Sequence, residues 1–305
     1  MLTFLVRRLL LLVLVLFGVV TLVFFLIHLI PGDPVDIMLG DQALAADKDV
    51  LRAAMGLDQP LGNQYIGYLG DLLAGDLGQS IHSRRPVLSE IWERFPATVE
   101  LMLGAMLVAL LIALPLGIIS ALRPYGWLDG SSMLISFLGI SIPNFWLGPM
   151  LIMVFSVQLG WLPVNERGGI EHLILPAITL GTAMAAMLSR MIRASLLEVL
   201  DEEYITNARA KGLPETLVVF KHALRNALIP VITIIGLQVG VLLSGAIITE
   251  AIFDWPGLGS LLLEGIYSRN YPLVQGCILV IATVYVLVNL MTDIAYAWAD
   301  PRVRL

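Results

Sequence analysis

Long apolar segments alternate with short polar ones along the whole chain. Six segments lack Asp, Glu, Lys and Arg and approach or exceed the roughly 20 residues that a helix needs to cross a bilayer. Hydrocarbon offers the backbone no hydrogen-bond partners, so each segment must satisfy its own peptide groups as an α-helix. The predicted spans are residues 9–30, 101–122, 133–159, 173–189, 227–249 and 273–292.

Two longer polar segments, residues 31–96 and 191–226, separate these spans. Within the first, short helices are predicted at 48–55 and 64–73, after a Pro-Gly-Asp-Pro turn signal. The expected organisation is a cytoplasmic end and first helix (1–30), a periplasmic loop region (31–96), a membrane core (97–292) that includes the cytoplasmic segment 191–226, and a cytoplasmic tail (293–305).

Composition and charge place the chain in a membrane and give it an orientation. With 58% hydrophobic and 14% charged residues, it is too apolar for a soluble or disordered protein. With both termini inside, eleven of the 18 Lys and Arg residues fall on the cytoplasmic side, as the positive-inside rule favours. Residues 1–30 are predicted to be an uncleaved anchor, since their apolar run is longer than that of a signal peptide.

Catalytic and metal-binding patterns are missing from the sequence. The four His residues fall at different depths, the one Cys has no neighbouring metal ligands, and no phosphate-binding glycine loop is present. We therefore expect no catalytic site, no metal site and no cofactor in this chain. The spans also lack the mid-membrane charge that ion-coupled carriers generally use, although a secondary carrier that acts without an ATPase stays an alternative.

The polar segment 191–226 predicts two helices joined by a sharp corner. Tyr204, Ile205 and Ala208 share one helix face, and Gly212 then ends that helix. Pro214 suits the first position of a second helix, in which Leu217, Phe220, Leu224 and Leu228 repeat at three to four residues. Such an element could dock a partner protein or rest on lipid headgroups through its Arg and Lys side chains.

Several motifs in this order resemble the permeases of bacterial ABC importers for dipeptides, oligopeptides, nickel and glutathione. The resemblance is carried by residues 204–212 (YITNARAKG) and 222–230 (HALRNALIP), and by 32–34, 75–80, 250–259, 271–276 and 300–302. Against the general importer loop pattern only Ala208, Gly212 and Leu224 match, and Thr206 stands where that pattern has Glu. The peptide-permease variant of this loop differs from the general pattern in the same way.

The resemblance implies an all-α, six-helix type 1 importer permease in the bacterial inner membrane, with both termini inside. It implies as partners a second homologous permease, two cytoplasmic ATPase subunits that bind ATP and Mg, and a periplasmic solute-binding protein. Nucleic acid is not expected, because the chain is acidic and has no basic block. The residues expected to couple to the ATPase are Tyr204, Ala208, Arg209, Ala210, Lys211, Gly212, Leu213, Glu215, His222 and Arg225.

Small and polar side chains within the spans are candidates for the translocation pathway, although each could instead pack between helices. The candidates are Ser141, Pro143, Asn144, Gln238, Ser244 and Thr249, whereas Gly181, Ala185 and Ser189 indicate close helix packing. Acidic residues near the outer span ends are expected to gate the mouth or contact the binding protein, or to form a solvated rim: Asp33, Asp76, Glu250 and Asp254. Trp255 could be an interfacial anchor.

The orientation can be tested with topology reporters. Alkaline phosphatase inserted within residues 31–96 should be active, and a fluorescent protein fused after residue 305 should fluoresce, because the first requires the periplasm and the second the cytoplasm. Phosphatase activity from an insertion within 191–226 would contradict the predicted topology.

Overall fold

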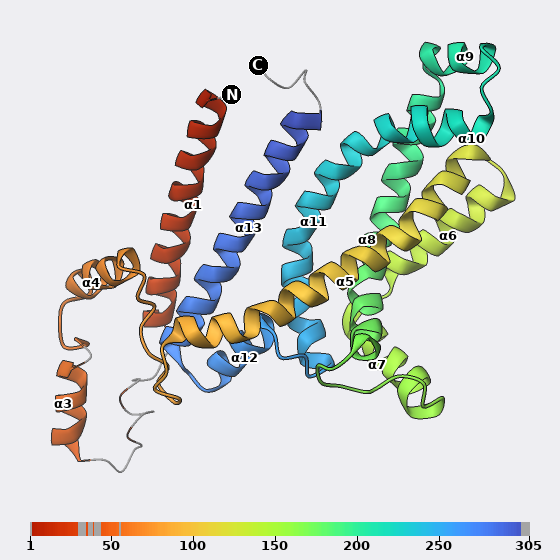
Figure 1. Ribbon diagram of the computed structural model, residues 1–305. Coiled ribbons are helices and arrows are strands. Elements are labelled where there is room, and N and C mark those ends of the chain that lie inside the picture. Colours follow the sequence, from red (N-terminus) through yellow and green to blue (C-terminus); the bar gives the residue numbers. More distant parts are fainter. Residues whose placement is uncertain (1, 30–34, 36–38, 40–43, 55, 300–305) are drawn as a thin grey trace. The chain divides into compact units, whose positions relative to one another are not determined.

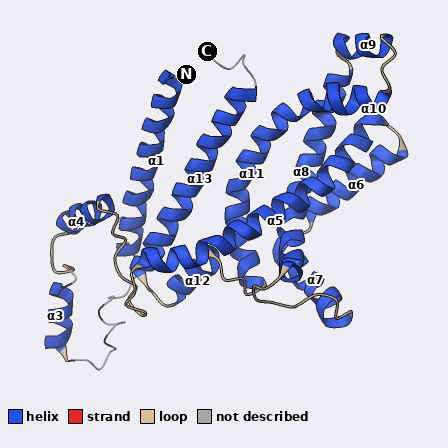
Figure 2. Cartoon of the chain, viewed as in Figure 1, coloured by secondary structure: helices blue, strands red, loops and turns tan. Residues whose placement is uncertain are grey.

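The computed structural model describes residues 2–29, 35, 39, 44–54 and 56–299. Figure 2 shows these residues as helices joined by loops, and the β structure within them is one isolated bridge between Gln79 and Pro86. The helices, labelled in Figure 1, are α1 (Leu2–Leu29), α3 (Ala45–Ala54), α4 (Leu61–Leu73), α5 (Val87–Leu122), α6 (Trp127–Ser141), α7 (Asn144–Leu151), the π-helix η1 (Ile152–Gln158), α8 (Ile170–Leu200), α9 (Glu203–Ala210), α10 (Glu215–Leu217), the π-helix η2 (Val218–Ala223), α11 (Leu224–Ile252), α12 (Leu258–Tyr267) and α13 (Tyr271–Ala299).

Four of the described helices are long and apolar enough to cross a membrane: Val87–Leu122, Ile170–Leu200, Glu215–Gly240 and Tyr271–Ile294. In α1, the expected first span, the corresponding apolar stretch is Leu10–Phe25. The all-helical membrane fold is therefore confirmed, while the count of six spans and the inward orientation of both termini stay predictions.

The expected third span, residues 133–159, is not one straight helix. Residues 127–141 and 144–158 form two helices bent by 99°. Ile142 (φ −89°, ψ 115°) and Pro143 (φ −65°, ψ 139°) are extended between them. Proline lacks an N–H and pushes the residue before it out of the helical region, so the break follows from the Ile-Pro step.

The described residues divide into two compact units. One comprises residues 97–256 and 285–299, and the other comprises the described residues within 2–96 together with 257–284. In the second unit the motif at 75–80 packs on the motif at 271–276. Asn270 accepts a hydrogen bond from the Ile81 N–H (3.1 Å) and donates one to Ser80 Oγ (2.7 Å), and a Cβ on Gly78 would lie 3.7 Å from Pro272.

Helix α5 begins well before its predicted span. It starts at Val87, inside the segment expected to be a loop, and its first turns carry Glu90, Glu93 and Arg94. Counting uninterrupted apolar residues locates the hydrocarbon-facing part of a helix, whereas the helix itself continues through its polar end.

Small residues form the buried face of α5. Ala97, Leu101, Ala105, Ala109 and Ala113 recur every four residues and are inaccessible to solvent. Leucines on the opposite face are exposed, namely Leu103, Leu107 and Leu111. Lipid is as apolar as leucine, so helices in a bilayer associate through small residues that permit close approach, and this distribution fits that rule.

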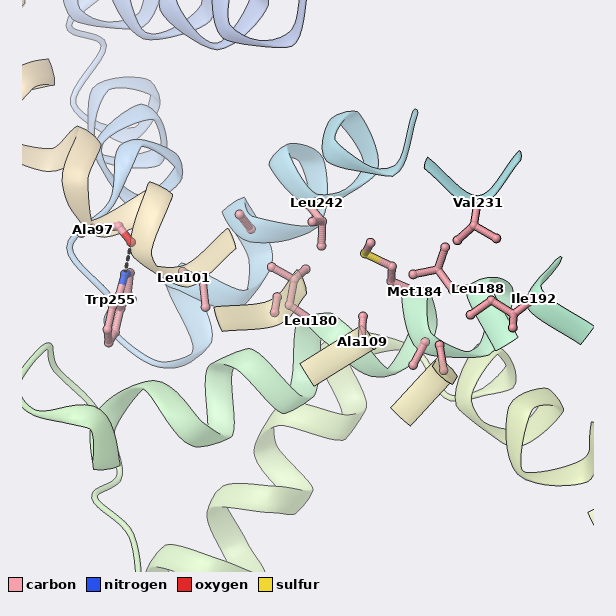
Figure 3. Close-up of a cluster of buried hydrophobic side chains, with 14 residues drawn as sticks. Ala97, Leu101, Ala109, Leu180, Met184, Leu188, Ile192, Val231, Leu242 and Trp255 are labelled. Atoms are coloured by element: carbon pink, nitrogen blue, oxygen red, sulfur yellow. Dashed lines mark hydrogen bonds between the residues drawn. The ribbon is translucent and has the colours of Figure 1, made fainter. Parts of the chain in front are cut away.

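The core of the first unit gathers this face of α5 with side chains of α8, α11 and Trp255 (Figure 3). The Trp255 indole is fully buried and its Nε1–H donates to Ala97 O at 2.8 Å. Trp255 therefore packs in the core of this unit, and its interpretation as an interfacial anchor is wrong.

Glycine and serine bring α8 close to its neighbours, as expected for Gly181, Ala185 and Ser189. A Cβ on Gly181 would lie 2.5 Å from Ala105 O. Ala185 and Ser189 are buried, and Ser189 Oγ lies 2.6 Å from Ser136 Oγ of α6.

Gly181→Ala should lower stability by about 1–3 kcal/mol, because the new methyl group must push α5 and α8 apart. Gly130→Ala is the matched control, since a Cβ on Gly130 would meet no atom within 4 Å. Thermal unfolding of the two detergent-solubilised variants checks this, and equal midpoints would contradict the close packing at Gly181.

Candidate coupling element and translocation pathway

The expected helix, corner and helix are present in the segment after α8. Helix α9 ends at Ala210, Lys211 caps it, and Gly212 follows with φ +74°. The Gly212 N–H donates to Arg209 O at 2.9 Å. Positive φ is a conformation that glycine adopts without strain, so Gly212 suits the corner. Pro214 occupies the N-cap of α10 (ψ 143°), one position before the expected one.

An ion pair crosses the corner. Arg209 Nη2 and Nε donate to the two Glu215 carboxylate oxygens at 2.7 and 3.2 Å, and both side chains are exposed. The hydrogen bond from Arg209 to Glu215 raises the pKa of Arg209. An exposed pair contributes at most about 1 kcal/mol, so it sets the geometry of the corner more than its stability.

Buried side chains hold α9 against the helices that flank it. Ile205 and Ala208 pack with Ala121 of α5, Leu196 of α8 and Val218 of η2. We call residues 203–223, from the start of α9 to the end of η2, the coupling element. Its helices are fixed to the membrane helices by this cluster.

One hydrogen bond reinforces the attachment, and a second joins the two membrane helices on either side of the element. Asn226 Nδ2 donates to Tyr204 Oη at 2.7 Å, and Ser195 Oγ of α8 donates to Ala227 O of α11 at 2.9 Å. Polar and apolar contacts thus connect the coupling element to both α8 and α11.

The predicted apolar face of the second helix is wrong at its first two positions, whereas Leu224 and Leu228 are half-buried. Leu217 and Phe220 are exposed, Phe220 by 60%, and the residues that pack inward are Val218, Val219, Ala223 and Ala227. The segment Val218–Ala223 is a π-helix, whose bonds run from residue i to i+5 and insert one extra residue into the turn. The inward face therefore shifts relative to a regular α-helix, and Phe220 is left on the surface.

The ten residues expected to couple to the ATPase lie within or beside this element. Ala208 is buried, and Leu213 and His222 are half-buried. The others are exposed: Tyr204, Arg209, Ala210, Lys211, Gly212, Glu215 and Arg225. The structure thus brings these residues together on one element and leaves most of them accessible.

The pathway candidates lie on two different elements. Ser141 and Pro143 are exposed and Asn144 is half-buried, all at the bend between α6 and α7. On α11, Thr249 is fully buried, and Gln238 is 8% exposed with its Nε2 2.7 Å from Met187 Sδ. The side chain of Ser244 lies outside the described residues.

The outer acidic residues have different environments. Glu250 is fully buried and accepts a hydrogen bond from Thr98 Oγ1 at 2.6 Å, so a solvated rim is the wrong description for it. Asp254 is exposed with φ +50°, and Asp76 is exposed and accepts from the Gly78 N–H at 2.8 Å. Asp33 lies outside the described residues.

An ion pair with a buried carboxylate and a half-buried guanidinium was missed by the sequence reasoning. Asp129 of α6 and Arg193 of α8 form two hydrogen bonds of 2.7 Å, and Asp129 is 5% exposed. The available signal was that the predicted topology puts both residues at the cytoplasmic ends of neighbouring spans, where opposite charges can pair.

These features define a class of protein: a polytopic helical membrane subunit with an exposed corner element anchored to its spans. Comparison with known families is specific. Residues 113–305 match the family model described as the binding-protein-dependent transport system inner membrane component, and residues 1–102 match the N-terminal model for the same systems. The chain belongs to this family of transport permeases.

Relatives match over the full chain. The Di/tripeptide transport system permease protein DppB of Pseudomonas aeruginosa is 47% identical, covering 100% of this chain and 99% of its own length. The Dipeptide transport system permease protein DppB of Alkalihalophilus pseudofirmus is 44% identical, with 100% of both covered. The Glutathione transport system permease protein GsiC of Escherichia coli O6:H1 is 47% identical, covering 100% of this chain and 99% of its own length.

Solved structures share the fold. A chain of the inward-facing MetNI methionine ABC transporter superposes with a TM-score of 0.60 at 19% identity, covering 69% of this chain and 96% of that one. A chain of an amino acid ABC transporter gives 0.52 at 15% identity, covering 71% and 95%. The protein is therefore a multi-pass membrane permease with the ABC importer fold, and neither finding supports a self-sufficient carrier.

Ile205→Ala should loosen the coupling element from the membrane helices, because Ile205 is fully buried and truncation of such a residue costs about 2–5 kcal/mol. Amides of α9 should then exchange hydrogen faster in mass spectrometry. Exposed Thr206→Ala is the control on the same helix, and equal exchange in both variants would rule out the anchoring role.

Proposed function

We propose that this permease, in the bacterial inner membrane, forms a translocation pathway for short peptides or peptide-like solutes with a second homologous permease. Its further partners are two cytoplasmic ATPase subunits, which bind ATP and Mg, and a periplasmic solute-binding protein. The observation that carries the proposal is the anchored coupling element, in a chain whose full-length relatives are named as dipeptide and glutathione permeases.

The surface of the coupling element supports docking to a protein. Phe220 and Tyr204 expose aromatic rings, and Lys211 and Lys221 add positive charge on the same element. Aromatic side chains are enriched in protein interfaces, and a rigid corner loses little conformational freedom on binding, so this surface suits a protein groove. Movement of the ATPase subunits would then be applied to α8 and α11 through the buried contacts of α9.

Ser141, Pro143, Asn144, Gln238, Ser244 and Thr249 stay the proposed pathway residues, and Asp33, Asp76, Glu250 and Asp254 the proposed outer gate or binding-protein contacts. A peptide backbone presents amide donors and carbonyl acceptors. Gln238 supports its assignment because its amide donates to the Met187 thioether, a weak acceptor that a peptide carbonyl could replace.

Co-purification and reconstitution test the function. The tagged chain should bring down an ATPase, and proteoliposomes that hold the complex and the binding protein should accumulate a labelled dipeptide or glutathione only with ATP. Uptake by this chain alone, driven by an ion gradient, would establish a secondary carrier instead. A complete complex that moves no solute of this class would favour an assembly or scaffold subunit with no conduction pathway.

Gly212→Asp should abolish stimulation of ATP hydrolysis by the loaded binding protein while leaving membrane insertion intact. The expected cause is backbone strain of roughly 1 kcal/mol or more at φ +74°, together with a misplaced carboxylate at the docking corner. Gly67→Asp is the matched control, since Gly67 lies on α4 with open space around it. Normal stimulation in the Gly212 variant would remove this corner from the coupling mechanism.

A further inference from the structure

The Asp129 carboxylate joins three helices at one end of the first unit. Arg193 Nε donates to Oδ1 and Nη2 to Oδ2, both at 2.7 Å. Ser120 Oγ of α5 donates to Oδ1, and the Tyr125 N–H of the turn before α6 donates to Oδ2 at 2.9 Å. All four contacts are charge-assisted, and the two from Arg193 fix orientation as well as distance.

This pair ends a seam of small residues between α6 and α8. Ser136 Oγ lies 2.6 Å from Ser189 Oγ, and a Cβ on Gly139 would lie 3.2 Å from Thr182 O. Along one face of α6 the contacts run in chain order from Asp129 through Ser136 to Gly139. Their partners on α8 run in the opposite order, from Arg193 through Ser189 to Thr182. The two helices are therefore antiparallel and closely packed from the ion pair to within one turn of the α6 end.

Each end of the seam meets an element of functional interest. Arg193 lies three residues, about one turn, before Leu196, which packs in the cluster that anchors α9. At the other end, α6 stops at Ser141 and the chain bends by 99° at Ile142 and Pro143. Arg193 and the seam are thus the contacts through which a displacement of the end of α8 would reach α6 and the bend.

We propose that Asp129 and Arg193 are positioning residues that make α6 follow α8, so that movement of the coupling element reaches the bend at Pro143. The inference rests on the proposed function, because it needs an ATPase that displaces α9. The neutral contact of Ser136 with Ser189 lies farther from α9 and lacks the two-point geometry of the ion pair. Of these seam contacts the ion pair is the one nearest α9 and the one that fixes orientation, so the proposal assigns transmission to it.

Spin labels at two positions test the proposal in the co-purified complex in nanodiscs. One is placed on α9 (Thr206→Cys) and one near the end of α6 (Leu138→Cys), both at exposed residues. The single native cysteine, Cys277, is fully buried and stays unlabelled. Spectra are recorded without nucleotide and with Mg²⁺ and a non-hydrolysable ATP analogue, in the parent, Asp129→Asn and Arg193→Gln.

In the parent both labels should respond to nucleotide. In each variant the Thr206→Cys label should still respond while the response at Leu138→Cys is lost. A role of the pair in general stability alone would alter the two labels together. Arg167→Gln is the matched control, because it breaks an ion pair with Glu100 in the same unit and should leave both responses unchanged.

Retention of the full response at position 138 in the variants would overturn the proposal, as would loss of the response at 206. Removing one partner of a buried pair leaves a charge uncompensated and can prevent assembly. The double variant Asp129→Asn/Arg193→Gln removes both charges and is judged by the same two labels; its failure to assemble would also overturn the transmission role. If the parent gave no response at 206, the proposed function itself would fail, which is a different outcome.

Discussion

The absence of backbone hydrogen-bond partners in hydrocarbon is the constraint on which this architecture depends. It requires helices, and because lipid competes equally for leucine, helix pairing is left to small residues and to a few polar contacts. The alanine face of α5, the approach of Gly181 to Ala105 and the serine contact between α6 and α8 are three expressions of that rule. At Asp129 and Arg193 the contact between helices is made by charged side chains instead of small ones. The Asp129 carboxylate also accepts hydrogen bonds from Ser120 and from the Tyr125 N–H.

The elements that sequence reasoning predicted well are those governed by local rules. The corner at Gly212 follows from glycine's freedom at positive φ, and the short helices α3 and α4 lie close to their predicted positions. The position of the residues around the corner could be predicted because Gly212 marks where the first helix ends. The sequence could not show which of them are buried, because that depends on η2, whose extra residue per turn shifts the face that packs inward. A repeat such as Leu217, Phe220, Leu224 and Leu228 carries no mark of a π-helix.

Long-range contacts account for the remaining differences. Trp255 packs in the core because its indole reaches Ala97 O, 158 positions earlier, and Glu250 is buried because Thr98 meets it from α5. A count of apolar residues along the chain gives no sign of either contact. The bend at Pro143 was visible as an Ile-Pro step within an apolar segment, but its size depends on how α7 packs against α8 and α11. The predicted span at 101–122 begins later than α5 because the helix continues through polar turns that a hydropathy count excludes, whereas its end at Leu122 agrees.

The second compact unit combines residues 2–96 with 257–284, and Asn270 makes hydrogen bonds with Ser80 and Ile81, about 190 positions earlier. At ribosomal rates of about 5–20 residues per second, the early half exists for roughly 10–40 s before its complement is synthesised. During that interval the loop at 75–86 lacks the amide that later satisfies it. The contacts of this unit that depend on Asn270 can therefore form only after residues 257–284 have been synthesised, and a product that ends before α12 would lack them.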